Sequence, residues 1–198
     1  VFKDNKVHFI PNSLESLLTP SVVAYNKNTT KIEVGRIAKD IAIINPDHAA
    51  GTFKRDMGID KKYTIHNKKY SPLELSGFVL MSIKNSAEEF LKQKVEHCVI
   101  TVPAYFNEDQ RSMTKQAAEF AGFNVERILN EPTAAAIAYG MQNIDEETKF
   151  LVFDLGGGTF DVCIMEMFEG VLEVVSVAGD TRLGGEDFTI RLCEYILK

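Results

Sequence analysis

The segment Asp154–Asp161 carries the residues whose types and spacing best suit chemistry, because it reads Asp-Leu-Gly-Gly-Gly-Thr-Phe-Asp. Three consecutive glycines, Gly156, Gly157 and Gly158, let backbone N–H groups approach a ligand with no Cβ in the way, and such N–H groups form an anion-binding concavity. Asp154 and Asp161 bracket the turn, and two carboxylates beside a phosphate require a divalent cation or its water shell between like charges. Thr159 adds a hydroxyl. The segment therefore predicts a site for a magnesium-bound nucleotide.

The flanking residues predict that this segment is a turn between two strands. The apolar run Phe150–Phe153 leads into it, and the alternating residues Phe160, Val162 and Ile164 follow it. An ordinary hairpin is the alternative interpretation, because glycine pairs join strands routinely. The aspartates, the threonine and the flanking strands together favour phosphate binding over that alternative.

Composition limits the kinds of protein that the chain can be. Its 198 residues are 45% hydrophobic and 25% charged, which is ordinary for a globular protein with one or two domains. The net charge of −6 argues against a nucleic-acid partner or an anionic membrane surface. Cys98, Cys163 and Cys193 form no short-spaced motif, so we expect buried free thiols in a reducing, cytoplasmic compartment. No apolar run approaches membrane-spanning length.

The elements that must position the glycine turn alternate between strands and helices. Capping residues Ser71 and Glu74 with Pro72 predict the start of the longest helix, and Gly122 predicts the end of the next one. We expect a turn at Asp4-Asn5 and a change of domain at residues 142–148. The predicted strands are 7–10, 20–25, 32–35, 98–102, 124–129 and 171–178, with short β segments near Tyr63 and Tyr70, and the predicted helices are 36–44, 107–121 and 131–141.

Patterns of apolar residues predict which faces of these elements are buried. The long helix carries one apolar stripe: Leu75, Phe78, Val79, Ile83, Ala87, Phe90 and Leu91. The segment Cys98–Val102 is nearly all apolar, as expected of a central strand covered on both faces. After a second glycine pair, Gly184-Gly185, a final helix is expected to turn Phe188, Leu192, Tyr195 and Ile196 inward. The order of elements predicts mixed α/β sheets in two lobes.

Four long motifs, in order, show that the chain closely resembles the ATPase domain of the seventy-kilodalton heat-shock chaperones, the DnaK type. They are Val99–Asn107, Asn130–Gly140, Asp154–Asp161 and Ala178–Phe188. The resemblance extends over essentially all residues and implies an actin-like, ribonuclease-H-like ATPase fold. Residues 1–141 correspond to the first lobe, with a shortened outer subdomain at about 52–95, and residues 149–198 correspond to the start of the second lobe.

The resemblance also implies roles for individual residues. Asp154 corresponds to an aspartate near the magnesium water shell and the attacking water, Glu131 to a glutamate that holds magnesium-bound water, and Lys54 to a lysine that reaches the γ-phosphate. The second phosphate loop and its second carboxylate correspond to Gly156, Gly157, Gly158, Thr159 and Asp161, with Gly184 and Gly185 also assigned to the nucleotide. Pro103 and Arg111 match positions that relay nucleotide state to a peptide-binding domain.

Four departures from the family pattern qualify these expectations. The family's opening strand and first phosphate loop are expected before Val1, and its adenosine-binding segments and peptide-binding domain are expected after Lys198, so the fragment alone is expected to be inactive. Only 16 residues separate Lys54 from Ser71. This short spacing resembles the HscC-type branch. Arg182 stands where many relatives carry histidine.

The resemblance implies hydrolysis of ATP to ADP with magnesium, coupled to the binding and release of unfolded client peptides with the help of co-chaperones. An actin-like filament protein or a sugar kinase is the alternative within the same superfamily. The motifs Val102–Phe106 and Asn130–Ala136 weigh against both. A non-catalytic interaction fragment is the alternative from a different class of protein, and a nucleotide-binding titration would separate it from an enzyme.

Overall fold

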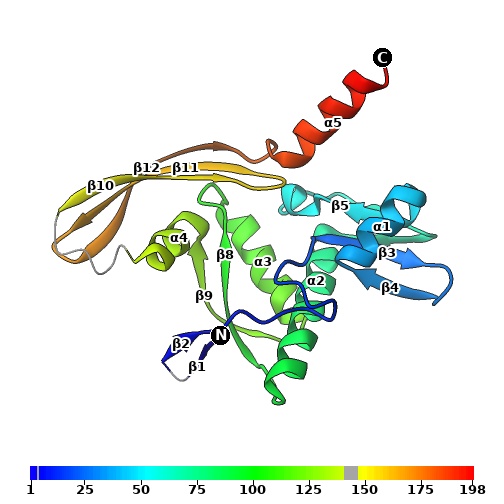
Figure 1. The fold of residues 1–198 in the computed structure, drawn as a ribbon, viewed down its shortest axis with the longest axis horizontal. Helices are drawn as coiled ribbons and strands as arrows, with labels where there is room; N and C mark the ends of the chain where they lie inside the picture. The colour runs from blue at the N-terminus through cyan, green and yellow to red at the C-terminus, as the bar shows by residue number, and fades with distance from the viewer. Residues whose placement is uncertain (4, 141–146) are drawn as a thin grey trace. The chain divides into compact units, whose positions relative to one another are not determined.

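The computed structural model describes residues 1–3, 5–140 and 147–198 (Figure 1). The described chain divides into two compact units. The first unit comprises Val1–Cys98 and Ser112–Glu126, and the second comprises Val99–Arg111 and Arg127–Lys198. The predicted change of domain at residues 142–148 lies mostly outside the described residues. Asp4, in the expected turn, and Met141, at the expected end of a helix, also lie outside the described residues.

Small antiparallel sheets and two helices make up the chain as far as residue 91. A three-stranded sheet has the order β4-β3-β5, and β1–β2 and β6–β7 are separate hairpins. The elements are β1 (Phe2–Lys3), β2 (Lys6–Val7), β3 (Val22–Asn26), β4 (Lys31–Val34), α1 (Arg36–Ile44), η1 (Pro46–His48), β5 (Ala49–Gly51), η2 (Phe53–Asp56), β6 (Tyr63–Ile65), β7 (Lys68–Tyr70) and α2 (Pro72–Leu91).

The core of this part lies between the three-stranded sheet, η2 and the start of α2. Its buried members are Val23, Ala50, Phe53, Ile65, Leu75 and Val79. The structure confirms the predicted start of α2, because Ser71 Oγ accepts a hydrogen bond from Glu74 N at 3.2 Å and Ser71 N donates to Glu74 Oε2 at 2.7 Å. Helix α1 also has its predicted bounds, and it ends before Pro46, whose ring disfavours helical backbone in the preceding residue.

Two predictions for this part of the chain are wrong in extent. The expected strand at 7–10 stops at Val7, because Pro11 has no N–H to donate and Asn12 Oδ1 accepts from the N–H groups of Leu14 and Ser16 instead. The apolar stripe of α2 is buried only in its first half. Ile83 and Phe90, farther along the helix, are 44% and 51% exposed.

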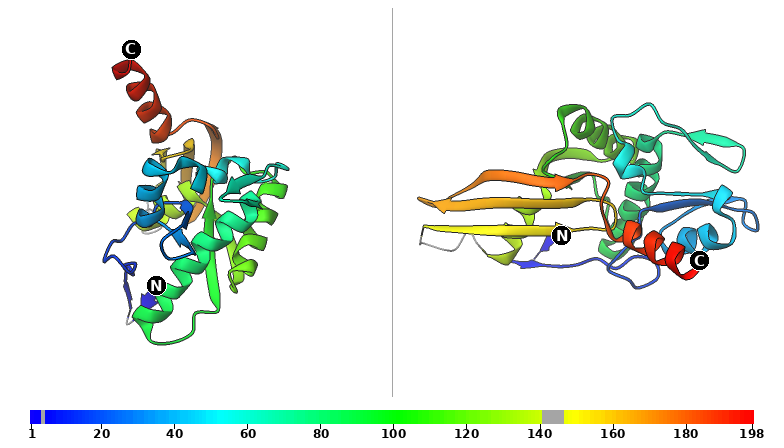
Figure 2. Two further views of the ribbon diagram at one scale, coloured as in Figure 1. Left: turned by 90° about the vertical axis from the view of Figure 1, so that its right-hand side faces the viewer. Right: turned by 90° about the horizontal axis from the view of Figure 1, so that it is seen from above.

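The remaining elements include the longest strands of the molecule. They are β8 (His97–Val102), α3 (Glu108–Phe120), β9 (Asn124–Asn130), α4 (Glu131–Tyr139), β10 (Thr148–Leu155), β11 (Phe160–Phe168), β12 (Val171–Asp180) and α5 (Gly185–Ile196). Helix α3 is followed by Gly122 with φ 82°, which confirms the predicted end. Strands β8 and β9 form a two-stranded sheet, and β10, β11 and β12 form an antiparallel sheet in that order (Figure 2).

Helix α4 covers one face of the β10–β12 sheet. Ala136 packs with Cys163, Met165 and Met167 of β11 in a buried cluster. Small side chains let the helix backbone approach the strands closely. Side chains alternate along a strand, so Asp161 lies on the same face of β11 as Cys163. Asp154, its partner on β10, shares that covered face.

Two burial predictions for the later elements are wrong. Strand β8 is not covered on both faces, because exposed residues alternate with partly or fully buried ones along it, and Val99 is 56% exposed. Phe188, Leu192, Tyr195 and Ile196 do not point into a core, since no described element packs broadly against α5 and all four side chains are exposed. Across the described residues, no helix has both the length and the apolar character needed to cross a membrane.

Candidate functional site

The antiparallel register of β10 and β11 places Asp154 directly opposite Asp161. Residues opposite each other on neighbouring strands share a face, and like charges in such positions destabilise a sheet. Asp161 is 2% exposed and Asp154 is partly buried. A cation beside the two carboxylates would offset their repulsion, so the donor set suits a divalent metal better than it suits an anion alone.

The residues present fit magnesium held partly by water. Mg²⁺ keeps several waters and binds proteins through one or two carboxylates plus substrate phosphates. Among the residues that the structure describes, no three or more His, Cys, Asp or Glu side chains are placed to hold a metal directly. Asp154 and Asp161 are therefore candidates for a two-carboxylate site. Glu131 is the first residue of α4. That it holds a magnesium-bound water stays a prediction.

The glycine turn between β10 and β11 is open where a ligand would approach. Gly156 N donates to Thr159 O at 3.0 Å and closes the turn. Apart from its chain neighbours, no atom of the described residues would lie within 4 Å of a Cβ built on Gly157. None of the three glycines has a positive φ angle, so backbone strain does not explain them. The space left free at Gly157 is therefore suited to an external group. Thr159 is buried within the turn.

The second glycine pair lies against the first glycine turn. Gly185 N donates to Gly156 O at 2.9 Å, and Glu186 N donates to Gly157 O at 3.0 Å. The start of α5 is thereby bonded to the turn through the backbone. Gly184 and Gly185 therefore lie beside Gly156–Gly158, and all five were predicted to contact the nucleotide. The contacts observed here join Gly185 and Glu186 to the glycine turn.

Arg111 holds the chain that follows β8. Its Nε donates to Phe106 O at 2.9 Å, and its Nη2 donates to Ala104 O at 3.4 Å and to Asn130 Oδ1 at 2.8 Å. Pro103 is fully buried in the same turn. Arg111 is therefore not a plain surface arginine. It connects the Pro103 turn to the residue that precedes Glu131.

Asn130 is a site residue that sequence reasoning missed. An asparagine immediately before a helix predicts a capping side chain. Here the side chain makes no cap hydrogen bond and instead accepts from Arg111. The local sequence gives no signal for this contact, because the donor lies 19 residues away.

Tyr105 is a second residue whose position near this part of the sheet the sequence did not reveal. Gly179 of β12 lies opposite Asp161 in the sheet register. A Cβ on Gly179 would stand 2.8 Å from Tyr105 Cε2 and 2.1 Å from Phe160 O. The missing side chain at Gly179 lets the Tyr105 ring approach the strand beside Asp161. The one sequence signal for this contact is a glycine within a strand, which often marks the close approach of another group.

Lys54 lies in η2, in the first unit, between the buried residues Phe53 and Asp56. Asp56 accepts hydrogen bonds from Lys61 Nζ at 2.5 Å and from the Tyr63 hydroxyl. The bond to Asp56 raises the pKa of Lys61. The backbone that carries Lys54 is therefore anchored on both sides, and its own side chain is partly exposed. Its predicted role remains a prediction.

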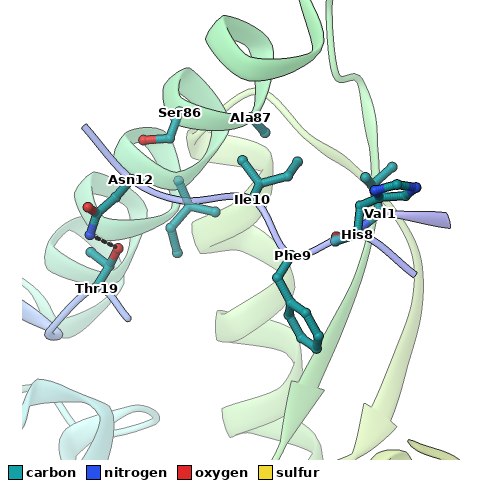
Figure 3. Close-up of a pocket in the computed structure, with 9 residues that line it drawn as sticks. Val1, His8, Phe9, Ile10, Asn12, Thr19, Ser86 and Ala87 are labelled. Carbon is teal, nitrogen blue, oxygen red and sulfur yellow. Dashed lines mark hydrogen bonds between the residues drawn. The ribbon is translucent and has the colours of Figure 1, made fainter. Parts of the chain in front are cut away.

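A separate hollow lies in the first unit between the N-terminal segment and α2 (Figure 3). It has a volume of about 260 Å³ and is lined mainly by apolar side chains, including Phe9, Ile10 and Ile83. Asn12 Nδ2 donates to Thr19 Oγ1 at 3.1 Å at its edge. Asp, Glu, Lys and Arg are absent from the described residues that line it, which are not of the kind that binds a magnesium phosphate.

A comparison with protein-family models assigns the chain to a family. The model for Hsp70 protein matches residues 1–67 and 59–198, which together span the whole chain. The chain belongs to the Hsp70 family. This membership implies the actin-like ATPase fold, and the mixed α/β architecture with several small sheets is consistent with part of that fold. It also supports a chaperone ATPase function in general terms, with ATP or ADP and magnesium as ligands.

Proposed function

We propose that the chain forms part of the nucleotide-binding domain of a chaperone that hydrolyses ATP to switch between holding and releasing unfolded peptides. The observation that carries this proposal is the site around the glycine turn. Asp154 and Asp161 face each other at the strand ends that border a turn whose Gly157 leaves room for an external group. Family membership supports the same activity.

In this proposal each part of the site has a distinct task. Backbone N–H groups of the glycine turn donate to phosphate oxygens, and the Thr159 hydroxyl lies beside them. Asp154 and Asp161 hold the water shell of magnesium, and Asp154 also orients the attacking water. Magnesium, when bound, neutralises charge on the phosphate oxygens. Lys54 donates to the γ-phosphate, where preorganised positive charge stabilises the transition state.

We also propose the finer assignments as parts of this function. Arg111 and Pro103 transmit the nucleotide state to a peptide-binding domain, and their shared turn is the physical basis for the idea. The short spacing between Lys54 and Ser71 favours an HscC-type branch. Three cysteines without a disulfide among them favour a reducing cytoplasm, where co-chaperones and client peptides would be the partners.

The test compares Asp154→Asn with the parent in the complete protein. The amide keeps the shape of the side chain but removes a charge, so we expect ATP turnover to fall about a hundredfold or more. Asp40→Asn is the matched control, because Asp40 is exposed and its pair with Arg36, at 3.0 Å, is also exposed. Single-turnover rates and melting temperatures are measured for all three proteins. Parental turnover by Asp154→Asn would remove this residue from the mechanism, and absence of MgATP binding by the parent would refute the function.

A further inference from the structure

The start of α5 approaches the glycine turn so closely that no side chain fits between them. A Cβ on Gly184 would stand 2.5 Å from the carbonyl carbon and oxygen of Gly157 and 2.5 Å from the nitrogen of Gly158. The φ of Gly184 is −170° and its ψ is −177°, an extended conformation that any residue adopts. Gly184 is therefore required for space and not for its dihedral angles.

Two hydrogen bonds between α5 and the glycine turn determine how the peptide units of the turn are oriented. The N–H groups of Gly185 and Glu186, in the first turn of α5, donate to the carbonyls of Gly156 and Gly157 at 2.9 and 3.0 Å. In a planar trans peptide the carbonyl and the N–H point in opposite directions. The carbonyl of Gly156 shares its peptide unit with the N–H of Gly157, and the carbonyl of Gly157 shares its unit with the N–H of Gly158. Both N–H groups are thus turned away from α5.

The same bonds make these N–H groups better donors. Hydrogen bonds in a chain polarise one another, so a peptide whose carbonyl accepts a bond has a more strongly polarised N–H. The positive end of the α5 dipole adds to this effect. Asp187 stabilises the arrangement, because its Oδ2 accepts from Gly184 N at 2.8 Å and holds the turn before the helix.

We propose that Gly184 and Asp187 are positioning residues that orient the N–H group of Gly157 toward a phosphate of the nucleotide. The inference rests on the proposed function, since it names how the same site is preorganised. In this arrangement the start of α5 contacts the carbonyl side of the turn, and the ligand takes the N–H side. Gly184 is then a support behind the phosphate loop and not itself a phosphate ligand.

Nucleotide affinity of four variants in the complete protein tests the proposal, with MgADP as the probe. Gly184→Ala pushes α5 away from the turn. Asp187→Ala removes the acceptor without adding bulk. Asp187→Asn retains an acceptor oxygen and is the conservative variant. Gly51→Ala is the control, because its Cβ would meet only Val22 Cγ2 at an ordinary 3.7 Å.

We expect Gly184→Ala and Asp187→Ala to weaken MgADP binding roughly tenfold to a hundredfold, the equivalent of one charge-assisted hydrogen bond. Asp187→Asn should restore most of the affinity, and Gly51→Ala should bind as the parent does. Melting temperatures without nucleotide identify any variant that loses its fold. If Gly184→Ala does not fold, the pair of Asp187 variants decides the question.

The outcomes separate this inference from the function on which it rests. A parent that binds no MgADP overturns the proposed function and the inference with it. A parent that binds, together with unchanged affinity in both Gly184→Ala and Asp187→Ala, overturns the inference alone. Equal weakening by Asp187→Asn and Asp187→Ala also overturns it, because the acceptor oxygen would then not be the feature that matters.

Discussion

The three cysteines occupy different environments, although all are free in the structure. Cys163 is fully buried on the covered face of β11, Cys98 is partly exposed in β8, and Cys193 is exposed on α5. The expectation that all three are buried is therefore wrong for Cys193. The helix that carries it is not covered by another described element, so its apolar neighbours do not shield the thiol.

These environments predict an order of reaction with a thiol reagent in the native protein. Cys193 should be alkylated first, Cys98 later and Cys163 last. Burial raises the pKa of Cys163, and burial also raises that of Cys98, so less of the reactive thiolate is present in each. Mass spectrometry after timed labelling measures the order. Fewer than three free thiols in denaturant, or early labelling of Cys163, would contradict the prediction.

Lys54 carries the most specific single-residue prediction. In the complete ATPase, Lys54→Ala should lower turnover about a hundredfold or more, because it removes a preorganised positive charge. Stability should change by only about 0.5 kcal/mol, since the side chain is partly exposed at the surface of η2. Lys68→Ala, at an exposed position of β7, is the matched control. Parental turnover by Lys54→Ala would show that the family's lysine is assigned to the wrong position.

The start of α2 is the element whose stability depends most plainly on pH. Hydrogen bonds from the Ser71 N–H and hydroxyl lower the pKa of Glu74. A carboxyl group with a lowered folded-state pKa contributes stability above its unfolded value of about 4.3, and this contribution is lost as the pH falls through the folded value. The capping box therefore stabilises α2 at neutral pH and weakens in acid.

Two variants test this element. Ser71→Ala should cost about 1 kcal/mol at neutral pH, the usual effect of losing a helix cap. Glu74→Gln should lower the melting temperature at pH 7, and the difference from the parent should narrow below about pH 4. Glu89→Gln, exposed on the same helix, controls for the loss of a charge. A difference that stays constant down to pH 3 would exclude a role for Glu74 ionisation.

At the scale of the whole molecule, two apolar surfaces of the second unit remain exposed. One is the side of α5 with Phe188, Leu192 and Ile196, and the other is the outer face of the β10–β12 sheet with Leu151 and Phe153. Several exposed apolar side chains on one face can promote association between molecules.

We expect the 198-residue chain to bind an apolar dye in its folded state and to self-associate as its concentration rises. The double variant Leu192→Lys and Ile196→Lys should reduce both effects, because it places charge on the exposed side of α5. Thr189→Lys, also exposed on α5, is the control for added charge. Sedimentation velocity over a range of concentrations measures the association. A chain that stays monomeric and dye-free at high concentration would contradict this expectation.

The local pattern of residues determined many of the elements and the central turn. Proline and capping residues predicted the start of α2, and the glycine triplet between two alternating runs predicted the β10–β11 turn. These features depend on neighbours within a few residues, so the printed order of the chain is enough to identify them. The resemblance to the Hsp70 family was also visible in the sequence, because its four motifs are each continuous segments, and the family model matches the chain.

Only the tertiary structure decided the contacts between distant segments and the burial of each face. The Asn130 side chain bonds Arg111 and does not cap α4, and Gly184 lies against Gly157, which is 27 positions earlier in the sequence. The apolar residues of α5 have the spacing of a buried helix, yet they are exposed. Periodicity states which side chains share a face, but whether that face is covered depends on which other segments fold against it.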